Sequence, residues 1–273
     1  MNKIVIPEFK DTYKVANIKP LFQTLIGSHI HGLEHPSSDI DYRAVHVYNK
    51  DLYISIHLDD IKTSIEAQED KVDAVSYELG AFLNILNKGA HNAYEMVYSP
   101  YFEFYGSDEL KKEFEDICKT CFNPYKLCLS YIGAMASAVS GLAKAFETMN
   151  AKKAIKCFFM HHRFLASYYY TLKYKDDNLF PPLLLEDLHK ALSEDNPPPL
   201  PNINDLFEEA SKEPEKVIGL LCENIDDLKD QIENIIKTQR PILIKKIEET
   251  HKDNTELLNN FYRKAVYELS NNN

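Results

Sequence analysis

The sequence lacks the features that mark membrane, secreted and disulfide-stabilised proteins. No apolar run approaches the ~18 residues that span a bilayer, and residues 1–10 alternate charges with short apolar pieces, unlike a signal peptide. Five cysteines leave one over from any full pairing, and no second ligand pair accompanies Cys118 and Cys121 to complete a zinc site. We therefore expect reduced thiols in a cytoplasmic protein without a membrane segment.

Positive charge is also scarce. The formal net charge is −11, and the only arginines are Arg43, Arg163, Arg240 and Arg263. A chain this acidic does not present the broad basic face of a non-specific nucleic-acid binder, although a local patch of lysines can still hold a short RNA or DNA end. The 273 residues, 44% of them hydrophobic, are enough to build one large or two modest domains with a proper core.

The first hundred residues combine strand and helix patterns. Leu21–Ile26 is apolar and ends at a Gly-Ser turn, and Ile40–Tyr48 is rich in β-branched and aromatic residues, so both are predicted strands. A further strand is predicted at Lys71–Ser76, after which apolar residues follow helical spacing until Gly89. Three less regular segments are predicted as an edge strand at 3–7, a short strand or helix at 52–58, and a helix that begins at 91–92.

After Pro100 the pattern becomes helical. Asn123-Pro124 opens a long helix through Met149, and a second helix is predicted from about Ala151 to Tyr174. Further helices are predicted at 183–192, 205–210, 214–223, 225–250 and 254–270, and Pro241 should break or kink the fourth of these. The predicted fold is α+β, with a small mixed-sheet domain at 1–105 followed by an α-helical domain at 106–273.

Two short motifs supply the two halves of one chemical site. Gly27-Ser28 forms a turn that leads into a helix, and such a turn presents backbone N–H groups that favour a phosphate. Asp39 and Asp41 stand at i and i+2 of a strand and share one face, and hard cations such as Mg²⁺ bind carboxylates together with substrate phosphates. Asp73, on a strand that can lie beside theirs, is the candidate third acid for two-metal phosphoryl chemistry.

The spacing of these motifs resembles a known superfamily. Gly27-Ser28-His-x-x-Gly, followed by Ser-Asp39-x-Asp41-x-Arg43, is similar to the nucleotidyltransferase superfamily of DNA polymerase beta, and within it to the RNA-ligase-associated, predicted nucleotidyltransferase family. The resemblance runs over about 21–192 and includes the segments 72–79, 92–100, 156–163 and 181–188. One departure is His31, where the family pattern leads us to expect an aromatic residue such as tyrosine.

The resemblance implies a role for each motif. Gly27 and Ser28 would hold the β- and γ-phosphates of a nucleotide. Asp39 and Asp41 would bind both metal ions, Mg²⁺ or Mn²⁺, while Asp73 would complete the ion on the nucleophile side and act as a base. The domain at 1–105 would then be the catalytic nucleotidyltransferase domain.

Basic residues are further nucleotide-binding candidates, each with a structural alternative. Arg43 would pair with Asp41 or touch phosphate, or form a salt bridge between strands. Lys156 and Arg163 share a helical stripe with Lys152 that would face the triphosphate, or form a solvated basic face.

Glu95 also has two interpretations. As the residue three positions after Asn92, it fits a helix-capping box, although it is also a candidate site residue. The capping role explains the glutamate without any chemistry.

The predicted activity is metal-dependent transfer of a nucleoside monophosphate from a nucleoside triphosphate to an acceptor hydroxyl, with release of pyrophosphate. ATP is the expected donor. An RNA 3′ end is the expected acceptor because the family is associated with RNA ligases. Two alternatives are transfer to a protein hydroxyl, as in antitoxins of this superfamily, and a non-catalytic nucleotide-binding module. The oligomeric state is left open.

Overall fold

The computed structural model describes residues 18–35, 38–55, 60–69, 71–192 and 200–271. The chain forms two compact units. The first comprises Met1–Ile30, Ser38–Phe122 and Lys252–Asn273, and the second comprises His31–Ser37 and Asn123–His251. The predicted edge strand at 3–7 lies outside the described residues, as do residues 56–58 of the predicted element at 52–58.

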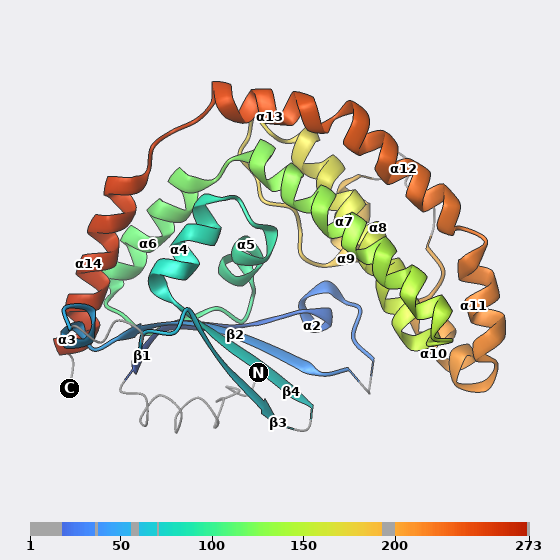
Figure 1. Cartoon of the computed structure of the whole chain (residues 1–273), viewed down its shortest axis with the longest axis horizontal. Helices are drawn as coiled ribbons and strands as arrows, with labels where there is room; N and C mark the ends of the chain where they lie inside the picture. Colours follow the sequence, from blue (N-terminus) through green and yellow to red (C-terminus); the bar gives the residue numbers. More distant parts are fainter. Residues whose placement is uncertain (1–17, 36–37, 56–59, 70, 193–199, 272–273) are drawn as a thin grey trace. The chain divides into compact units, whose positions relative to one another are not determined.

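A mixed sheet of five strands forms the base of the first unit (Figure 1). In spatial order the strands are β3 (Ser64–Glu69), β4 (Val72–Glu78), β2 (Ile40–Tyr48), β1 (Ile18–Ile26) and β5 (Glu103–Phe104). The β2–β4 pair is parallel, and the other three pairs are antiparallel. The parallel pair at the centre of the sheet carries two of the predicted aspartates.

The predicted strands correspond to β1, β2 and β4, whereas β3 was not predicted. Its sequence, Ser-Ile-Glu-Ala-Gln-Glu, offers only Ile65 and Ala67 as alternating apolar residues and contains alanine, glutamine and glutamate, which favour helices. As an edge strand it pairs only with β4, so hydrogen bonds to one neighbour define it and a buried apolar face does not.

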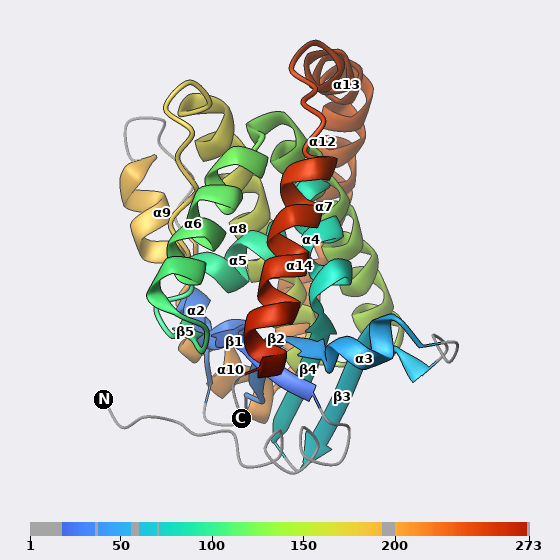
Figure 2. The same cartoon turned by 90° about the vertical axis from the view of Figure 1, so that its left-hand side faces the viewer.

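Helices of the first unit cover this sheet. They are α3 (Lys50–Tyr53), α4 (Leu79–Asn87), α5 (His91–Tyr98), α6 (Asp108–Cys121) and α14 (Thr255–Asn271), together with most of the short α2 (Ser28–His31). The predicted stop at Gly89 is confirmed, since α4 ends at Asn87 and Gly89 has a positive φ of 75°. The helix α14, red in Figures 1 and 2, packs against β1, β2, α3, α4 and α6.

Aromatic rings join the sheet to these helices. Phe114 of α6 lies with its ring centroid 5.4 Å from Phe22 of β1, 6.2 Å from Phe82 of α4 and 5.8 Å from Phe261 of α14. All four side chains are almost fully buried. Ring pairs at these separations add to the apolar burial that holds the elements together, so α6 and α14 are parts of the core of the first unit.

The second unit is an α-helical assembly. It contains α7 (Pro124–Glu147), α8 (Ala151–Lys173), α9 (Leu185–Ala191), α10 (Ile203–Lys212), α11 (Pro214–Cys222), α12 (Ile225–Thr238) and α13 (Arg240–Glu249). The helices α7 and α8 form a hairpin; α12 and α13 pack on α7, while α9, α10 and α11 pack on α8 (Figure 1). The predicted break at Pro241 is confirmed, because α13 starts with that proline in its first turn.

One helix among the described residues, α7, is long and apolar enough to cross a membrane by length and composition. Core helices of soluble proteins pass the same test, so it is weak evidence for a membrane span. Its contacts with α8, α12 and α13 explain its apolar character as packing within the helical unit.

The α+β fold class is confirmed, whereas the division of the chain differs from the predicted boundary at 105/106. Residues 106–122 belong to the first unit, and the chain returns to that unit at Lys252. The physical reason is that an amphipathic helix buries its apolar face against whichever partner the fold provides. The sequences of α6 and α14 each show such an apolar face, but the local pattern does not indicate that this face packs toward the sheet.

Candidate functional site

The Gly27-Ser28 turn, the predicted phosphate site, begins where β1 ends. Gly27 follows Ile26 with a φ of +74°, a left-handed conformation that favours glycine, and α2 begins at Ser28. A side chain at this position is excluded for a second reason: a Cβ would overlap the Asp41 carboxylate oxygen Oδ2 and lie 2.9 Å from Cγ. The turn and the Asp41 carboxylate are therefore direct neighbours, which brings the predicted phosphate site and the predicted acids together.

Strand pairing places the aspartates. Asp41 is the partner of Ile26 on β1 and of Asp73 on β4, so the two aspartates occupy equivalent positions on parallel neighbouring strands. Asp39 precedes β2 and is exposed. The prediction that Asp73 stands on a strand beside that of Asp41 is confirmed.

Arg43 forms the strand-to-strand salt bridge of the structural alternative, and its partner is Asp73. Its Nη2 lies 3.1 Å from Asp73 Oδ2, and its Nη1 donates to the backbone oxygens of Tyr42 at 2.7 Å and Asp73 at 3.2 Å. The Arg43 side chain is 15% exposed and that of Asp73 is 42% exposed. The guanidinium thus holds both the side chain and the backbone of Asp73.

The donor chemistry fits a hard divalent cation. Carboxylates of Asp41 and Asp73 stand side by side in register, with Asp39 two residues before Asp41, and carboxylate oxygens are the ligands that Mg²⁺ and Mn²⁺ prefer. Within the described part of the chain, no three His, Cys, Asp or Glu residues are already gathered as a metal cluster. Asp39, Asp41 and Asp73 would hold a cation here together with the phosphates of a nucleotide.

The predicted basic stripe on α8 is divided by burial. Lys152 and Lys156 are exposed, whereas Arg163 is 1% exposed inside the second unit. Arg163 Nε donates to the backbone oxygen of Leu183 at 3.3 Å, and its guanidinium carbon lies 5.8 Å from the ring centroid of Phe164. The three residues do not form one solvated basic face, because Arg163 lies in the interior of the unit.

His31, the departure from the family pattern, shares this interior with Arg163. The histidine is 1% exposed, and its Nδ1 is hydrogen-bonded at 3.2 Å to the same Leu183 oxygen. A carbonyl oxygen only accepts, so Nδ1 carries the proton in this bond. The sequence did not predict the Leu183 carbonyl as a shared acceptor, because every residue has a backbone carbonyl and residue identity does not distinguish this one.

The capping interpretation of Glu95 is wrong. The helix α5 is capped by Ala90, with no side-chain hydrogen bond to its end, and Asn92 instead accepts from the amide of Ala93 at 3.0 Å. Glu95 is 5% exposed on α5. It is therefore a buried carboxylate within the first unit, which leaves its candidacy as a site residue in place.

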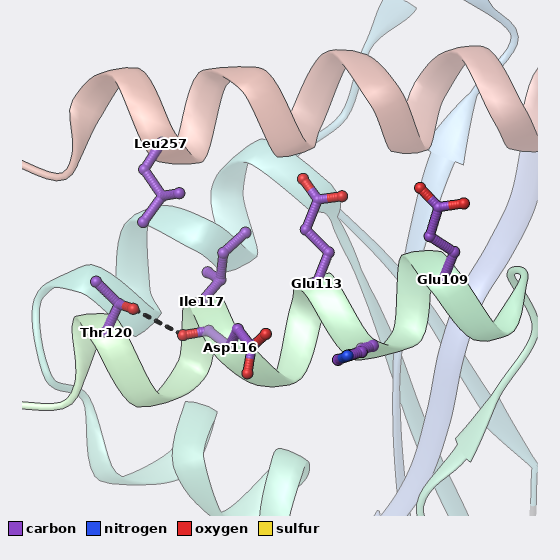
Figure 3. A pocket seen from close by; sticks show the side chains of 7 residues that line it. Glu109, Glu113, Asp116, Ile117, Thr120 and Leu257 are labelled. Atoms are coloured by element: carbon purple, nitrogen blue, oxygen red, sulfur yellow. Dashed lines mark hydrogen bonds between the residues drawn. The ribbon is translucent and has the colours of Figure 1, made fainter.

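A pocket of about 260 Å³ lies between α6 and α14, separate from the predicted site residues (Figure 3). It is lined by Glu109, Lys112, Glu113, Asp116, Ile117, Thr120 and Leu257. Lys264 of α14 bridges Glu109 at 2.9 Å and Glu113 at 2.7 Å. These ion pairs account for two of the acids as links between the helices.

A glycine turn at a strand end, next to an aspartate that is in register with a second aspartate, fits the class of polymerase beta-like nucleotidyltransferases. The chain belongs to the RlaP family, the RNA repair pathway DNA polymerase beta family, whose sequence model matches residues 1–264. The family is one of polymerase beta-like nucleotidyltransferases linked to RNA repair. Membership in it supports the assignment of this protein as an enzyme.

Other comparisons add little. No curated protein matches this chain. One solved structure that it resembles is a nucleotidyltransferase-like protein from Exiguobacterium sibiricum 255-15, with 12% sequence identity over 97% of this chain and 86% of that one. The TM-score of 0.34 is too low to establish a shared arrangement of the two chains.

Proposed function

We propose that this protein transfers a nucleoside monophosphate from a nucleoside triphosphate, with ATP as the expected donor, to the 3′ hydroxyl of an RNA. The observation that carries the proposal is the contact between Gly27 and the Asp41 carboxylate, combined with the register of Asp41 and Asp73. The Gly27-Ser28 turn, the proposed phosphate site, and two acids thus lie together at the N-terminal end of the parallel strand pair. The RNA acceptor rests on the family's link to RNA repair.

Each residue of the proposed site has a separate task. The Gly27-Ser28 turn binds the β- and γ-phosphates through backbone N–H groups and the Ser28 hydroxyl. Asp39, Asp41 and Asp73 hold Mg²⁺ or Mn²⁺, which supplies positive charge to the phosphates and the reacting hydroxyl. The acceptor oxygen attacks the α-phosphorus and loses its proton to Asp73, while the bond to the β-phosphate oxygen breaks and pyrophosphate leaves.

We propose different roles for Lys156 and Arg163, because Lys156 is exposed and Arg163 is buried. Lys156 is exposed and is proposed to contact the triphosphate. Arg163 is bonded to the Leu183 carbonyl inside the second unit. We therefore propose that Arg163 supports nucleotide binding by shaping the unit that carries it. We further propose a cytoplasmic location, where nucleoside triphosphates and RNA are both present.

A labelling experiment tests the proposal. The purified protein is incubated with each α-labelled nucleoside triphosphate, Mg²⁺ or Mn²⁺, and either RNA with free 3′ hydroxyls or a cell lysate. Label on RNA 3′ ends is the expected result. Label on protein would replace RNA by a protein hydroxyl as acceptor, the alternative that a net charge of −11 favours. No transfer to either acceptor would overturn nucleotidyl transfer altogether.

A matched pair of double variants ties activity to the site. Asp39→Ala/Asp41→Ala is expected to lower the transfer rate by about a thousandfold or more, because charge stabilisation is the largest part of such catalysis. Asp226→Ala/Asp227→Ala removes two exposed aspartates from the first turn of α12 and should leave the rate unchanged. Full activity of the first variant would show that the site is elsewhere.

A further inference from the structure

Arg43 has a contact pattern that is unusual for a phosphate ligand. Both hydrogens of Nη1 are used inside the protein, on the backbone oxygens of Tyr42 at 2.7 Å and Asp73 at 3.2 Å. Its Nη2 donates to Asp73 Oδ2 at 3.1 Å. An arginine that recognises phosphate presents its two parallel N–H groups to the ligand. Here the guanidinium addresses the neighbouring strand, and its side chain is only 15% exposed.

Asp73 is held in a correspondingly asymmetric way. Arg43 binds one carboxylate oxygen, Oδ2, and the backbone oxygen of the same residue. The other oxygen, Oδ1, takes part in no hydrogen bond or ion pair with the described residues, and the Asp73 side chain is 42% exposed. A carboxylate fixed through one oxygen keeps its rotamer while the other oxygen remains available to a ligand.

The charges around Asp73 explain why this arrangement matters. Asp41 stands beside it in register on β2 and contributes a second negative charge. Arg43 offsets one of the two charges through its ion pair with Asp73. Together these contacts define a one-oxygen site at Asp73 that is prepared before any ligand arrives.

We propose that Arg43 is a positioning residue: it fixes Asp73 through Oδ2 so that Oδ1 alone faces the acceptor side, and it weakens the hold of the aspartates on a divalent cation. The part of this inference that concerns catalysis, the effect of Arg43 on the transfer rate, rests on the proposed function. It replaces the expectation that Arg43 binds the nucleotide. A neutral residue at 43 would release Asp73 and remove a positive charge close to the cation, and the loss of charge outweighs the loss of order.

Mn²⁺ binding to the nucleotide-free protein tests this directly. Free Mn²⁺ is followed by electron paramagnetic resonance during titration of the wild type, Arg43→Gln and Arg43→Lys. Arg263→Gln serves as the matched control, because Arg263 is exposed on α14 and, among the described residues, donates only to Asn260 at 3.2 Å, three residues earlier on the same helix. Arg43→Gln should bind Mn²⁺ at least about threefold more tightly than the wild type. Arg43→Lys should stay near the wild-type affinity because it keeps the charge.

Steady-state kinetics supply the second readout. Arg43→Gln should lower kcat for nucleotidyl transfer by about 10- to 100-fold with little change in KM for the triphosphate. Arg43→Lys should recover part of this loss. A raised KM with unchanged Mn²⁺ affinity would identify Arg43 as a phosphate ligand and overturn the proposal. Unchanged values for both quantities, or a wild type that does not bind Mn²⁺, would also overturn it.

The two proposals fail in different ways. If the wild type transfers nucleotide to neither acceptor but Arg43→Gln tightens Mn²⁺ binding, the proposed function is wrong and the role of Arg43 at Asp73 stands. If transfer occurs and Arg43→Gln leaves Mn²⁺ affinity and kcat unchanged, the proposed function stands and the role of Arg43 falls. Circular dichroism spectra of all variants are compared with that of the wild type to check that each protein retains its fold.

Discussion

At the scale of single residues, Gly27 carries the strongest constraint in the site. Gly27→Ala imposes a strained backbone and pushes against the Asp41 carboxylate. We expect the transfer rate to fall by about a hundredfold, because displacements of about 1 Å in a reacting geometry have effects of this size. The rate is measured with labelled triphosphate at saturating RNA.

A second glycine provides the control for this substitution. Gly219 lies in α11, and a Cβ added there would meet nothing within 4 Å. Gly219→Ala should therefore keep full activity and gain about 0.5–1 kcal/mol of helix stability. Equal activity of Gly27→Ala and Gly219→Ala would contradict the place assigned to the turn.

His46 predicts how stability depends on pH. The imidazole is fully buried on β2, with Nδ1 2.7 Å from Ser76 Oγ, and burial lowers its pKa from 6.5 to about 4. The unfolded chain therefore binds a proton that the folded chain refuses, so stability falls as pH drops from 6.5 toward 4. The full effect is about 3 kcal/mol. Urea unfolding at several pH values measures it.

The His46→Gln variant is the control: it removes the titrating imidazole, and the comparison uses the change of stability with pH rather than the absolute stability. His46→Gln should reduce the dependence of the unfolding free energy on pH over this range without abolishing it, because burial also lowers the pKa of His162 to about 4. His251→Gln changes an exposed histidine and should leave the slope as it is in the wild type. An unchanged slope in His46→Gln would assign the acid sensitivity to another group.

At the scale of elements, α14 is fastened to the sheet by a buried carboxylate. Glu78, 6% exposed at the end of β4, accepts from the hydroxyls of Tyr53 at 2.9 Å and Tyr262 at 3.0 Å, and from the amide of Ala81 at 3.1 Å. Tyr262→Phe should lower the free energy of unfolding by about 1–2 kcal/mol. Tyr267→Phe, at a ring that is 66% exposed on the same helix, should change it little. Comparable losses in both variants would contradict this link.

The elements also show how far sequence reasoning reaches. The sequence predicted β1, β2 and β4 because their segments are rich in apolar and β-branched residues. It predicted α7 and α8 because a helix-start signal is followed by apolar residues at helical spacing. The partner of Arg43 could not be predicted, since it depends on the register of β2 against β4, which no local pattern records. The buried state of Arg163 has the same origin: the Leu183 carbonyl reaches it from a distant segment. Contacts between segments that are distant in the sequence determine the partner of Arg43 and the burial of Arg163, and local sequence patterns do not record such contacts.

At the scale of the whole molecule, residues 123–251 form an insertion whose ends meet. Asn123 Nδ2 donates to Thr250 Oγ1 at 3.1 Å, so the chain enters and leaves the second unit at neighbouring points. Segments with adjacent ends are commonly able to fold alone. We expect a fragment of residues 123–251 to be helical and to unfold cooperatively, as measured by circular dichroism. A fragment without helical signal would show that the unit depends on the rest of the chain.

The return of α14 to the first unit determines the order in which the protein matures. A ribosome completes residues 123–251 before it makes α14, whereas Phe114 and Glu78 receive their partners Phe261 and Tyr262 only afterwards. During translation the helical insertion can assemble while the first unit still exposes an unfinished core. A nascent chain that stops after residue 251 but before α14 thus carries every predicted acid and lacks the packing that α14 supplies to the first unit.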